Sequence, residues 1–255
     1  MAWWGTLLGG ALGYMLGGPL GAMLGAALGR NFDVGINLAG QHAFSPGDTE
    51  RVQAAFFTAT FSIMGHVAKS DGIVSNDEIT AARNIMAQMQ LDPRQREAAI
   101  KLFNEGKQPG FPLDEVLKQF KHECHGRRNL IQMFIEIQVA TVLADGKIHP
   151  AERELLYHIA DTLGFSRQQI EQFFHFATGG SQASKTSALE EAYALLGVKA
   201  SDDDATVKKA YRRLMNQHHP DKLVAKGLPE EMMKLATEKS QQIQTAYDLI
   251  KKHRH

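Results

Sequence analysis

The residues with the most distinctive chemistry lie near the C-terminus, where His219, Pro220 and Asp221 are followed directly by Lys222. Proline cannot continue a helix and restricts the residue before it to extended geometry, so the sequence predicts a rigid loop that presents an imidazole and a carboxylate. No nucleophile lies beside His219 in the sequence, so we expect no catalytic site and no enzyme activity in the chain itself. Two interpretations are left, an ordinary turn and a docking loop for a partner protein.

A positively charged helix face leads into this loop. At 100° per residue, Val207, Ala210 and Leu214 form an apolar face. The opposite side carries four basic residues and no acid, and these are Lys208, Lys209, Arg212 and Arg213. Such a face is commonly only a solvated surface. Because its charge is uncompensated locally and continues into the loop, it favours docking on a negatively charged partner.

Three helices are expected to position the loop and the basic face. A short amphipathic helix around Tyr193 should end at Gly197. Ser201 and Asp204 predict a capping box at the start of the basic helix. A third helix begins near Pro229, and its apolar face can pack against that of the basic helix. The three would form an antiparallel helix pair with the first helix laid along it.

The stretches EEAYALLGV, KKAYRRLMNQHHPDK and IQTAYDLI resemble the J-domain of DnaJ-type co-chaperones, over about residues 188–252. The resemblance implies that the His-Pro-Asp loop stimulates ATP hydrolysis by a DnaK-type chaperone, and that the basic face and Lys222 bind this partner. It also implies a set of core rather than contact residues, namely Tyr193, Leu196, Tyr211, Leu214 and Tyr247. Two features depart from the commonest pattern, Ala192 and the stretch LVAKGL after the loop. The sequence also lacks the Gly/Phe-rich and cysteine-rich parts with which full-length DnaJ handles clients.

The middle of the chain, residues 49–176, has helical periodicity and an internal repeat. The stretch SDGIVSNDE at residues 70–78 aligns with ADGKIHPAE at residues 144–152, an offset of 74 residues. In both copies an apolar helix runs into Asp-Gly, and a new helix follows with an acid near its start. This doubled pattern resembles the TerB-like helical domain, which is named from tellurite-resistance proteins.

Two interpretations compete for the acids of the repeat, which are Asp71, Glu78, Asp145 and Glu152. In the structural one, Ser75 and Glu78 form a capping box, and Pro150 with Glu152 starts a helix. In the functional one, the four carboxylates come together and bind a divalent cation, because carboxylate oxygens are the ligands that calcium prefers. The resemblance to TerB-like domains implies acids at these turns that are associated with such an ion.

The first thirty residues predict a membrane anchor. Residues 1–29 contain no charged side chain, and as a helix they would extend about 43 Å, enough to cross a hydrocarbon layer of about 30 Å with tilt. Trp3 and Trp4 are typical of interfacial anchors. A cleaved signal peptide and a buried glycine-rich hairpin are the alternatives. Glycine at every fourth position allows close helix packing, so we expect either a monomeric anchor or a homodimer through Gly9, Gly13, Gly17, Gly21 and Gly25.

Composition excludes several other functions. Lys plus Arg and Asp plus Glu both number 28, so net charge gives no reason to expect nucleic acid as a partner. A single cysteine, Cys124, excludes an internal disulfide and a cysteine-based zinc module. We therefore expect no cofactor apart from a divalent cation in the TerB-like domain.

The sequence as a whole predicts an all-α protein. The expected segments are a transmembrane helix (1–30), a juxtamembrane linker (31–48), a TerB-like helical domain (49–176), a second linker (177–187) and a J-domain (188–255). This arrangement resembles that of membrane-anchored DnaJ-like co-chaperones of Gram-negative bacteria. We expect the chain to act on membrane-proximal clients or in envelope signalling. Because a DnaK-type partner needs ATP, we expect a single-pass inner-membrane protein with a periplasmic N-terminus and a cytoplasmic bulk. The alternative is a membrane signalling adaptor whose TerB-like domain senses a metal ion or envelope stress.

Overall fold

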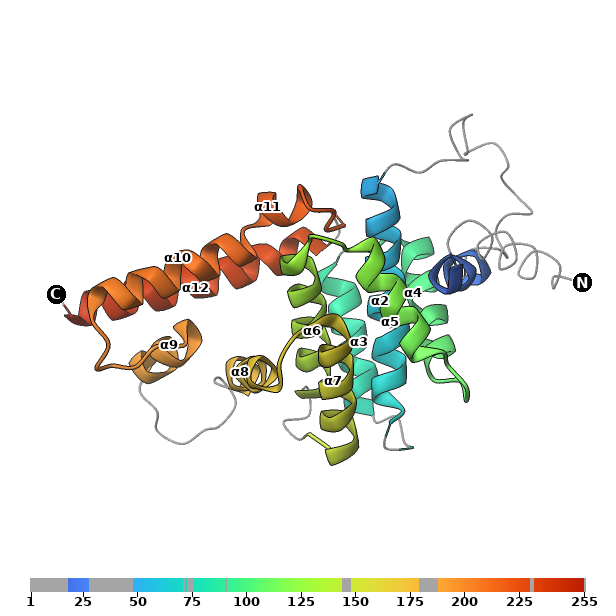
Figure 1. Cartoon of the computed structure of the whole chain (residues 1–255), viewed down its shortest axis with the longest axis horizontal. Coiled ribbons are helices and arrows are strands. Elements are labelled where there is room, and N and C mark those ends of the chain that lie inside the picture. The colour runs from blue at the N-terminus through green and yellow to red at the C-terminus, as the bar shows by residue number, and fades with distance from the viewer. Residues whose placement is uncertain are drawn as a thin grey trace, which may run out of the picture.

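The computed structural model describes residues 18–27, 48–70, 72, 76–89, 91–143, 148–178, 188–229 and 232–254. Every regular element in these residues is a helix, which confirms the predicted all-α fold (Figure 1). The labelled helices are α2 (Asp48–Ala68), α3 (Asn76–Gln88), α4 (Pro93–Gly106), α5 (Leu113–Glu123), α6 (Arg128–Val142), α7 (Pro150–Leu163), α8 (Arg167–Thr178), α9 (Ala188–Leu196), α10 (Asp204–His218), α11 (Pro220–Val224) and α12 (Met233–Arg254).

Helix α2 is the centre of the larger domain and contacts α4, α5, α6 and α7. Its stretch from Thr58 to Gly65 is buried on all sides, as expected of a helix that carries small and apolar residues around its whole circumference. Phe56 packs against Phe120 and Phe134 with ring centroids 6.0 Å and 6.4 Å apart. Helix α2 therefore organises a single hydrophobic core to which the surrounding helices contribute one face each.

Two glycines allow α2 and α4 to cross closely. A Cβ atom added at Gly65 would lie 2.0 Å from the carbonyl oxygen of Phe103, and one at Gly106 would lie 1.7 Å from that of Ser62. Both distances are far below van der Waals contact, so only glycine fits at these positions. Glycine is unfavourable inside a helix, and the close packing of the two backbones offsets that cost.

Helix α7 begins as the structural interpretation of the repeat predicted. Pro150 is its first residue, His149 is the N-cap, and the side chain of Glu152 accepts a hydrogen bond from the His149 amide at 2.9 Å. The helix ends at Gly164, whose φ of 87° lies in the left-handed region. The expected Pro-first helix start at Pro150 is confirmed.

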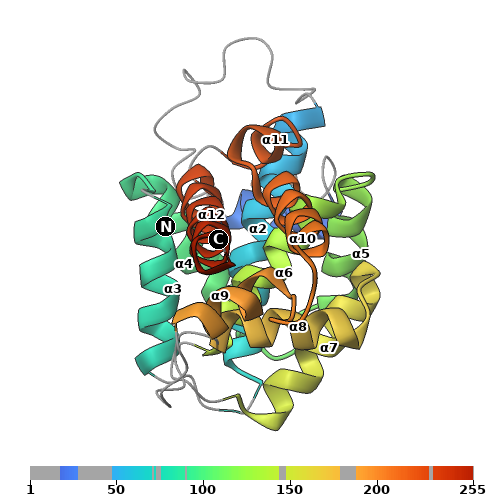
Figure 2. The ribbon, with the colours of Figure 1, turned by 90° about the vertical axis from the view of Figure 1, so that its left-hand side faces the viewer.

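The C-terminal module is the predicted antiparallel pair, in which α10 and α12 lie side by side and α9 packs against them (Figures 1 and 2). Its own core contains Tyr193, Leu196, Leu214 and Ile250, all buried. Tyr211 and Tyr247 stack on each other with centroids 4.1 Å apart and are only partly buried. The core role expected for Tyr193, Leu196 and Leu214 is therefore confirmed, whereas the two stacked tyrosines lie at the edge of that core.

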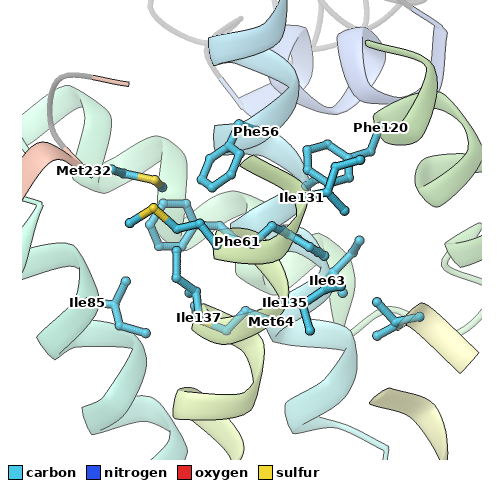
Figure 3. Close-up of a cluster of buried hydrophobic side chains, with 14 of the residues drawn as sticks. Phe56, Phe61, Ile63, Met64, Ile85, Phe120, Ile131, Ile135, Ile137 and Met232 are labelled. Atoms are coloured by element: carbon cyan, nitrogen blue, oxygen red, sulfur yellow. The ribbon is translucent and has the colours of Figure 1, made fainter. Parts of the chain in front are cut away.

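The loop end of this module does not belong to its own core. Leu223 of α11, together with Leu228, Met232 and Ala236, is fully buried and belongs to the hydrophobic cluster built around α2. Met232 lies beside Phe56 and Phe61 in that cluster (Figure 3). The segment that follows α11 approaches the N-terminal part of α2, where an added Cβ at Gly227 would lie 2.8 Å from Val52 Cγ1 (Figure 1).

Residues 18–27, drawn in dark blue in Figure 1, form a helical segment that packs on the larger domain. The amide of Leu20 donates to Gln119 Oε1 at 2.8 Å, and Lys101 Nζ donates to the carbonyl oxygen of Ala27 at 2.8 Å. Within the described ranges no helix combines the length and apolar character that a bilayer crossing needs. Gly21 and Gly25 are half-buried in this segment, while Gly9, Gly13 and Gly17 lie outside the described residues.

Candidate partner-binding site

The basic helix α10 begins two residues later than the predicted capping box implied. Asp203, not Ser201, is the N-cap, and its side chain accepts a hydrogen bond from the Thr206 amide at 2.9 Å. Hydrogen bonds from the Thr206 hydroxyl and amide hold the pKa of Asp203 below its ordinary value. The expected pairing of Ser201 with Asp204 was wrong, because three successive aspartates offered equivalent caps and the backbone geometry selected the second.

Arg254, near the end of α12, fixes the start of α10 in place. Its guanidinium donates to the Tyr193 hydroxyl at 2.9 Å, to the Asp202 carbonyl at 2.8 Å and to the Asp204 carboxylate at 2.8 Å. The guanidinium also lies over the ring of Tyr193. One side chain therefore ties α9, α10 and α12 together. This role could not be predicted from the sequence, where Arg254 is one of several basic residues in the last turn of the helix.

The four basic residues of α10 are exposed on one side of the helix, as predicted: Lys208, Lys209, Arg212 and Arg213. In the part of the chain that the structure describes, none of them forms an ion pair with an acid. The opposite face of the helix is buried through Val207, Ala210 and Leu214. The helix therefore presents a continuous positive strip whose charge is free to interact with another molecule.

The loop has the rigid geometry expected of its proline. His219 ends α10 in extended geometry, with φ −63° and ψ 123°, and Pro220 is the first residue of the short helix α11. Asp221 and Lys222 are exposed, and the Lys222 ammonium donates to the side-chain oxygen of Asn216. The loop therefore holds a carboxylate and a cation at the end of the positive strip.

His219 itself is half-buried. Among the described residues its Nδ1 atom has no hydrogen-bond partner although it is buried. A buried nitrogen without a partner is costly, and such atoms are rare in folded proteins. The loop thus keeps an imidazole with unused hydrogen-bonding capacity next to the exposed Asp221.

The neighbouring His218 is a site residue that the sequence interpretation missed. Its backbone carbonyl accepts a hydrogen bond from the Ser240 hydroxyl at 2.7 Å, and its Nε2 lies 3.5 Å from Glu136 Oε1 on α6. Burial lowers the pKa of His218, and the nearby Glu136 opposes this effect only partly. The helical spacing could have indicated the burial of His218, because this residue lies four positions after the buried Leu214 and hence on the apolar face of the helix.

The acids predicted for a cation site are only partly described. Asp71 and Asp145 lie outside the described residues, and the structure places the backbone of Glu78 in α3 but not its side chain. Glu152 is buried and serves as the capping partner of His149. Within the described ranges no cluster of three or more histidine, cysteine, aspartate or glutamate side chains has a metal-binding arrangement.

Comparisons with known proteins match three family models along the chain. The family model for the DnaJ domain matches residues 191–255, the one for tellurite resistance protein TerB matches residues 57–174, and the one for the co-chaperone DjlA transmembrane domain matches residues 1–42. No solved structure matches the chain.

Curated relatives match most or all of the chain. The co-chaperone protein DjlA of Photorhabdus laumondii is 44% identical over 271 residues, which cover 100% of this chain and 99% of the relative. That of Yersinia pestis is 44% identical over 275 residues, again 100% and 99% of the two chains. That of Escherichia coli K12 is 47% identical over 218 residues, 79% and 80% of the two chains.

Proposed function

The chain belongs to the co-chaperone DjlA family, and from this premise we propose that its J-domain binds a DnaK-type chaperone and stimulates ATP hydrolysis by that partner. The observation that carries the proposal is the exposed strip Lys208, Lys209, Arg212 and Arg213, which ends at the His-Pro-Asp loop and forms no ion pair with an acid among the described residues. A strip of this kind is suited to bind an acidic surface and to orient the loop that follows it.

Binding and stimulation would be divided between the helix and the loop. The positive strip supplies long-range attraction and speeds encounter with the partner. The loop then presents Asp221 and the imidazole of His219 in a geometry fixed by Pro220, so that little conformational entropy is lost on binding. The bond that is cleaved belongs to ATP bound by the partner, and the loop acts on that reaction through its contact with the partner.

The match to the DjlA transmembrane domain supports anchoring in a membrane. We place the chain in the bacterial inner membrane with a periplasmic N-terminus and residues 31–255 in the cytoplasm, because the proposed partner depends on ATP. Clients close to the membrane are then the natural substrates. Protease added outside spheroplasts should leave the J-domain intact, and its digestion there would refute this orientation.

Two finer properties complete the proposal. Close packing through the recurring glycines would let two anchors pair as a homodimer. A divalent cation would bind the acids of the repeat, with Asp71 and Asp145 as the ligands to test first. Both rest on sequence spacing, and calorimetric titration of the chain with calcium and manganese would test the second by the presence or absence of binding heat.

The central experiment replaces His219 by glutamine in the full chain and measures single-turnover ATP hydrolysis by a DnaK-type chaperone. We expect His219→Gln to lose stimulation, while the far-UV spectrum and melting temperature stay unchanged because the side chain is only half-buried. The matched control is His253→Gln, an exposed histidine on α12 in the same module. Full stimulation by His219→Gln would refute the assignment of the loop.

A further inference from the structure

We propose that the TerB-like domain holds the His-Pro-Asp loop in its working position through one interface. In it, the end of α10 contacts α6, and α11 with residues 225–229 and 232–236 packs into the cluster around α2. We call this the loop-end interface. The inference rests on the proposed function, and it adds a positioning role for a domain to which J-domain activity is not otherwise attributed. Val52 and Glu136 are its principal positioning residues on the TerB-like side.

The first argument is the division of the hydrophobic cores. The far end of the helix pair is packed internally by residues such as Leu196 and Ile250. At the loop end, Leu223, Leu228 and Met232 are fully buried but belong to the cluster around α2. The module therefore lacks an internal core beneath its own loop, and the TerB-like domain supplies the apolar surface that covers those side chains.

The second argument is the close approach at Gly227. Its φ of 91° lies in the left-handed region, and a Cβ atom added there would lie 2.8 Å from Val52 Cγ1 on α2. The chain turns here directly against α2, six residues after Asp221. A left-handed glycine at a point of close contact indicates a packed interface and not an incidental approach of two surfaces.

Polar contacts continue the interface on the other side of the loop. His218 Nε2 lies 3.5 Å from Glu136 Oε1, and that oxygen also accepts a hydrogen bond from Gln132 Nε2 at 2.9 Å. Asn129 Nδ2 lies 3.5 Å from the carbonyl oxygen of Asn216. The residue immediately before the His-Pro-Asp tripeptide is thus held by α6, while the residues after the tripeptide are held by α2.

The interface leaves the partner-binding side uncovered. Lys208, Lys209 and Arg212 on α10 and Asp221 and Lys222 in the loop are all exposed while the loop end is packed on the TerB-like domain. The buried residues of this segment face the opposite direction, into the core. Packing of the loop end is therefore compatible with docking of the partner, and we infer that it supports the working conformation instead of blocking it.

A disulfide across the interface tests this inference directly. Val52→Cys combined with Gly227→Cys places two thiols where the Val52 Cβ and an added Cβ are 3.2 Å apart, close to the value of about 3.8 Å found in disulfides. The native Cys124 does not compete, because it is buried and burial raises the pKa of its thiol to about 12. The full chain is oxidised, freed of oxidant, and compared with the same protein after reduction.

We expect the intramolecular disulfide to form in high yield, and the oxidised chain to stimulate the chaperone at least as well as the reduced chain, in which the substitution of Gly227 loosens the interface. Failure of the disulfide to form, or loss of stimulation that reduction restores, would overturn the inference. If neither form of the variant nor the parent chain stimulated hydrolysis, the proposed function would fail, an outcome distinct from a difference between oxidised and reduced protein.

A second variant loosens the interface without adding a thiol. Gly227→Ala forces a methyl group against Val52, whereas Gly110→Ala carries the same left-handed strain at φ 84° with no atom within 4 Å. We expect Gly227→Ala to accelerate hydrogen exchange in residues 219–228 and to lower stimulation by up to about tenfold, while Gly110→Ala does neither. Equal behaviour of the two variants would count against the loop-end interface.

Discussion

The shared core predicts that a cavity at Leu228 destabilises both domains. Leu228 is fully buried in the cluster around α2, although it belongs in sequence to the J-domain. Replacement of a buried leucine by alanine costs about 2–5 kcal/mol, the lost transfer energy plus the cost of the cavity that remains. This is a large part of the total stability of about 5–15 kcal/mol that is typical of a domain. Leu228→Ala should therefore weaken the packing of α2 as well as that of α12.

Native-state hydrogen exchange measured by mass spectrometry can locate this loss. Because about 1.4 kcal/mol corresponds to a factor of ten, exchange of globally protected amides should accelerate about 30-fold or more in both α2 and α12. The control is Leu249→Ala, at a leucine of α12 that is 36% exposed, which should cost less than about 1 kcal/mol. Faster exchange in α12 alone, with α2 protected as in the parent chain, would refute a core that the two domains share.

Three further predictions concern helix packing, pH and the anchor. Gly65→Ala should lower the free energy of unfolding by about 1–3 kcal/mol in a urea titration, since the methyl group overlaps the Phe103 carbonyl; a gain of about 1 kcal/mol, as helix propensity alone gives, would contradict this. Burial lowers the pKa of His218, so the unfolded chain binds the proton more tightly and stability should fall as the pH drops below 6.5, by at most about 1.4 kcal/mol per pH unit from this residue. In a plot of the urea midpoint against pH, His218→Gln should reduce the slope by the contribution of this residue. An unchanged slope would show that His218 is not the source of the pH dependence. Gly13→Ile with Gly17→Ile should abolish crosslinking of two anchors in membranes, whereas Ala11→Ile should not; unchanged crosslinking of the double variant would rule out pairing through the glycines.

Local sequence patterns predicted the parts of the site that local geometry controls. The three and four spacing of Val207, Ala210 and Leu214 identified the buried face of α10, and hence the exposed basic strip opposite it. Pro220 fixed the extended geometry of His219 before any contact was known. These features depend on helix periodicity and on the covalent constraint of proline, both of which can be inferred from a few adjacent residues.

Long-range packing accounts for what the sequence did not reveal. The stretch LVAKGL looked like an unusual loop, but Leu223 and Leu228 are buried against α2, more than 150 residues earlier in the chain. The helix crossing at Gly65 likewise depends on the backbone of α4 and has no local signature. The wrong prediction of Ser201 as the N-cap has the same cause. Asp202, Asp203 and Asp204 have equivalent capping propensities, and only the path of the folded chain distinguishes them.

The burial of Leu223, Leu228 and Met232 against α2 also limits how the J-domain can search for its partner. A module on a free tether sweeps a volume set by the length of the tether, and it meets a partner in many orientations. With its loop end packed on α2, this module keeps one orientation relative to the rest of the chain. The distance over which the module can meet a partner is then determined by the dimensions of the folded domains and not by the length of the segment between α8 and α9. A chaperone that binds the positive strip of α10 would therefore approach this chain from a fixed direction.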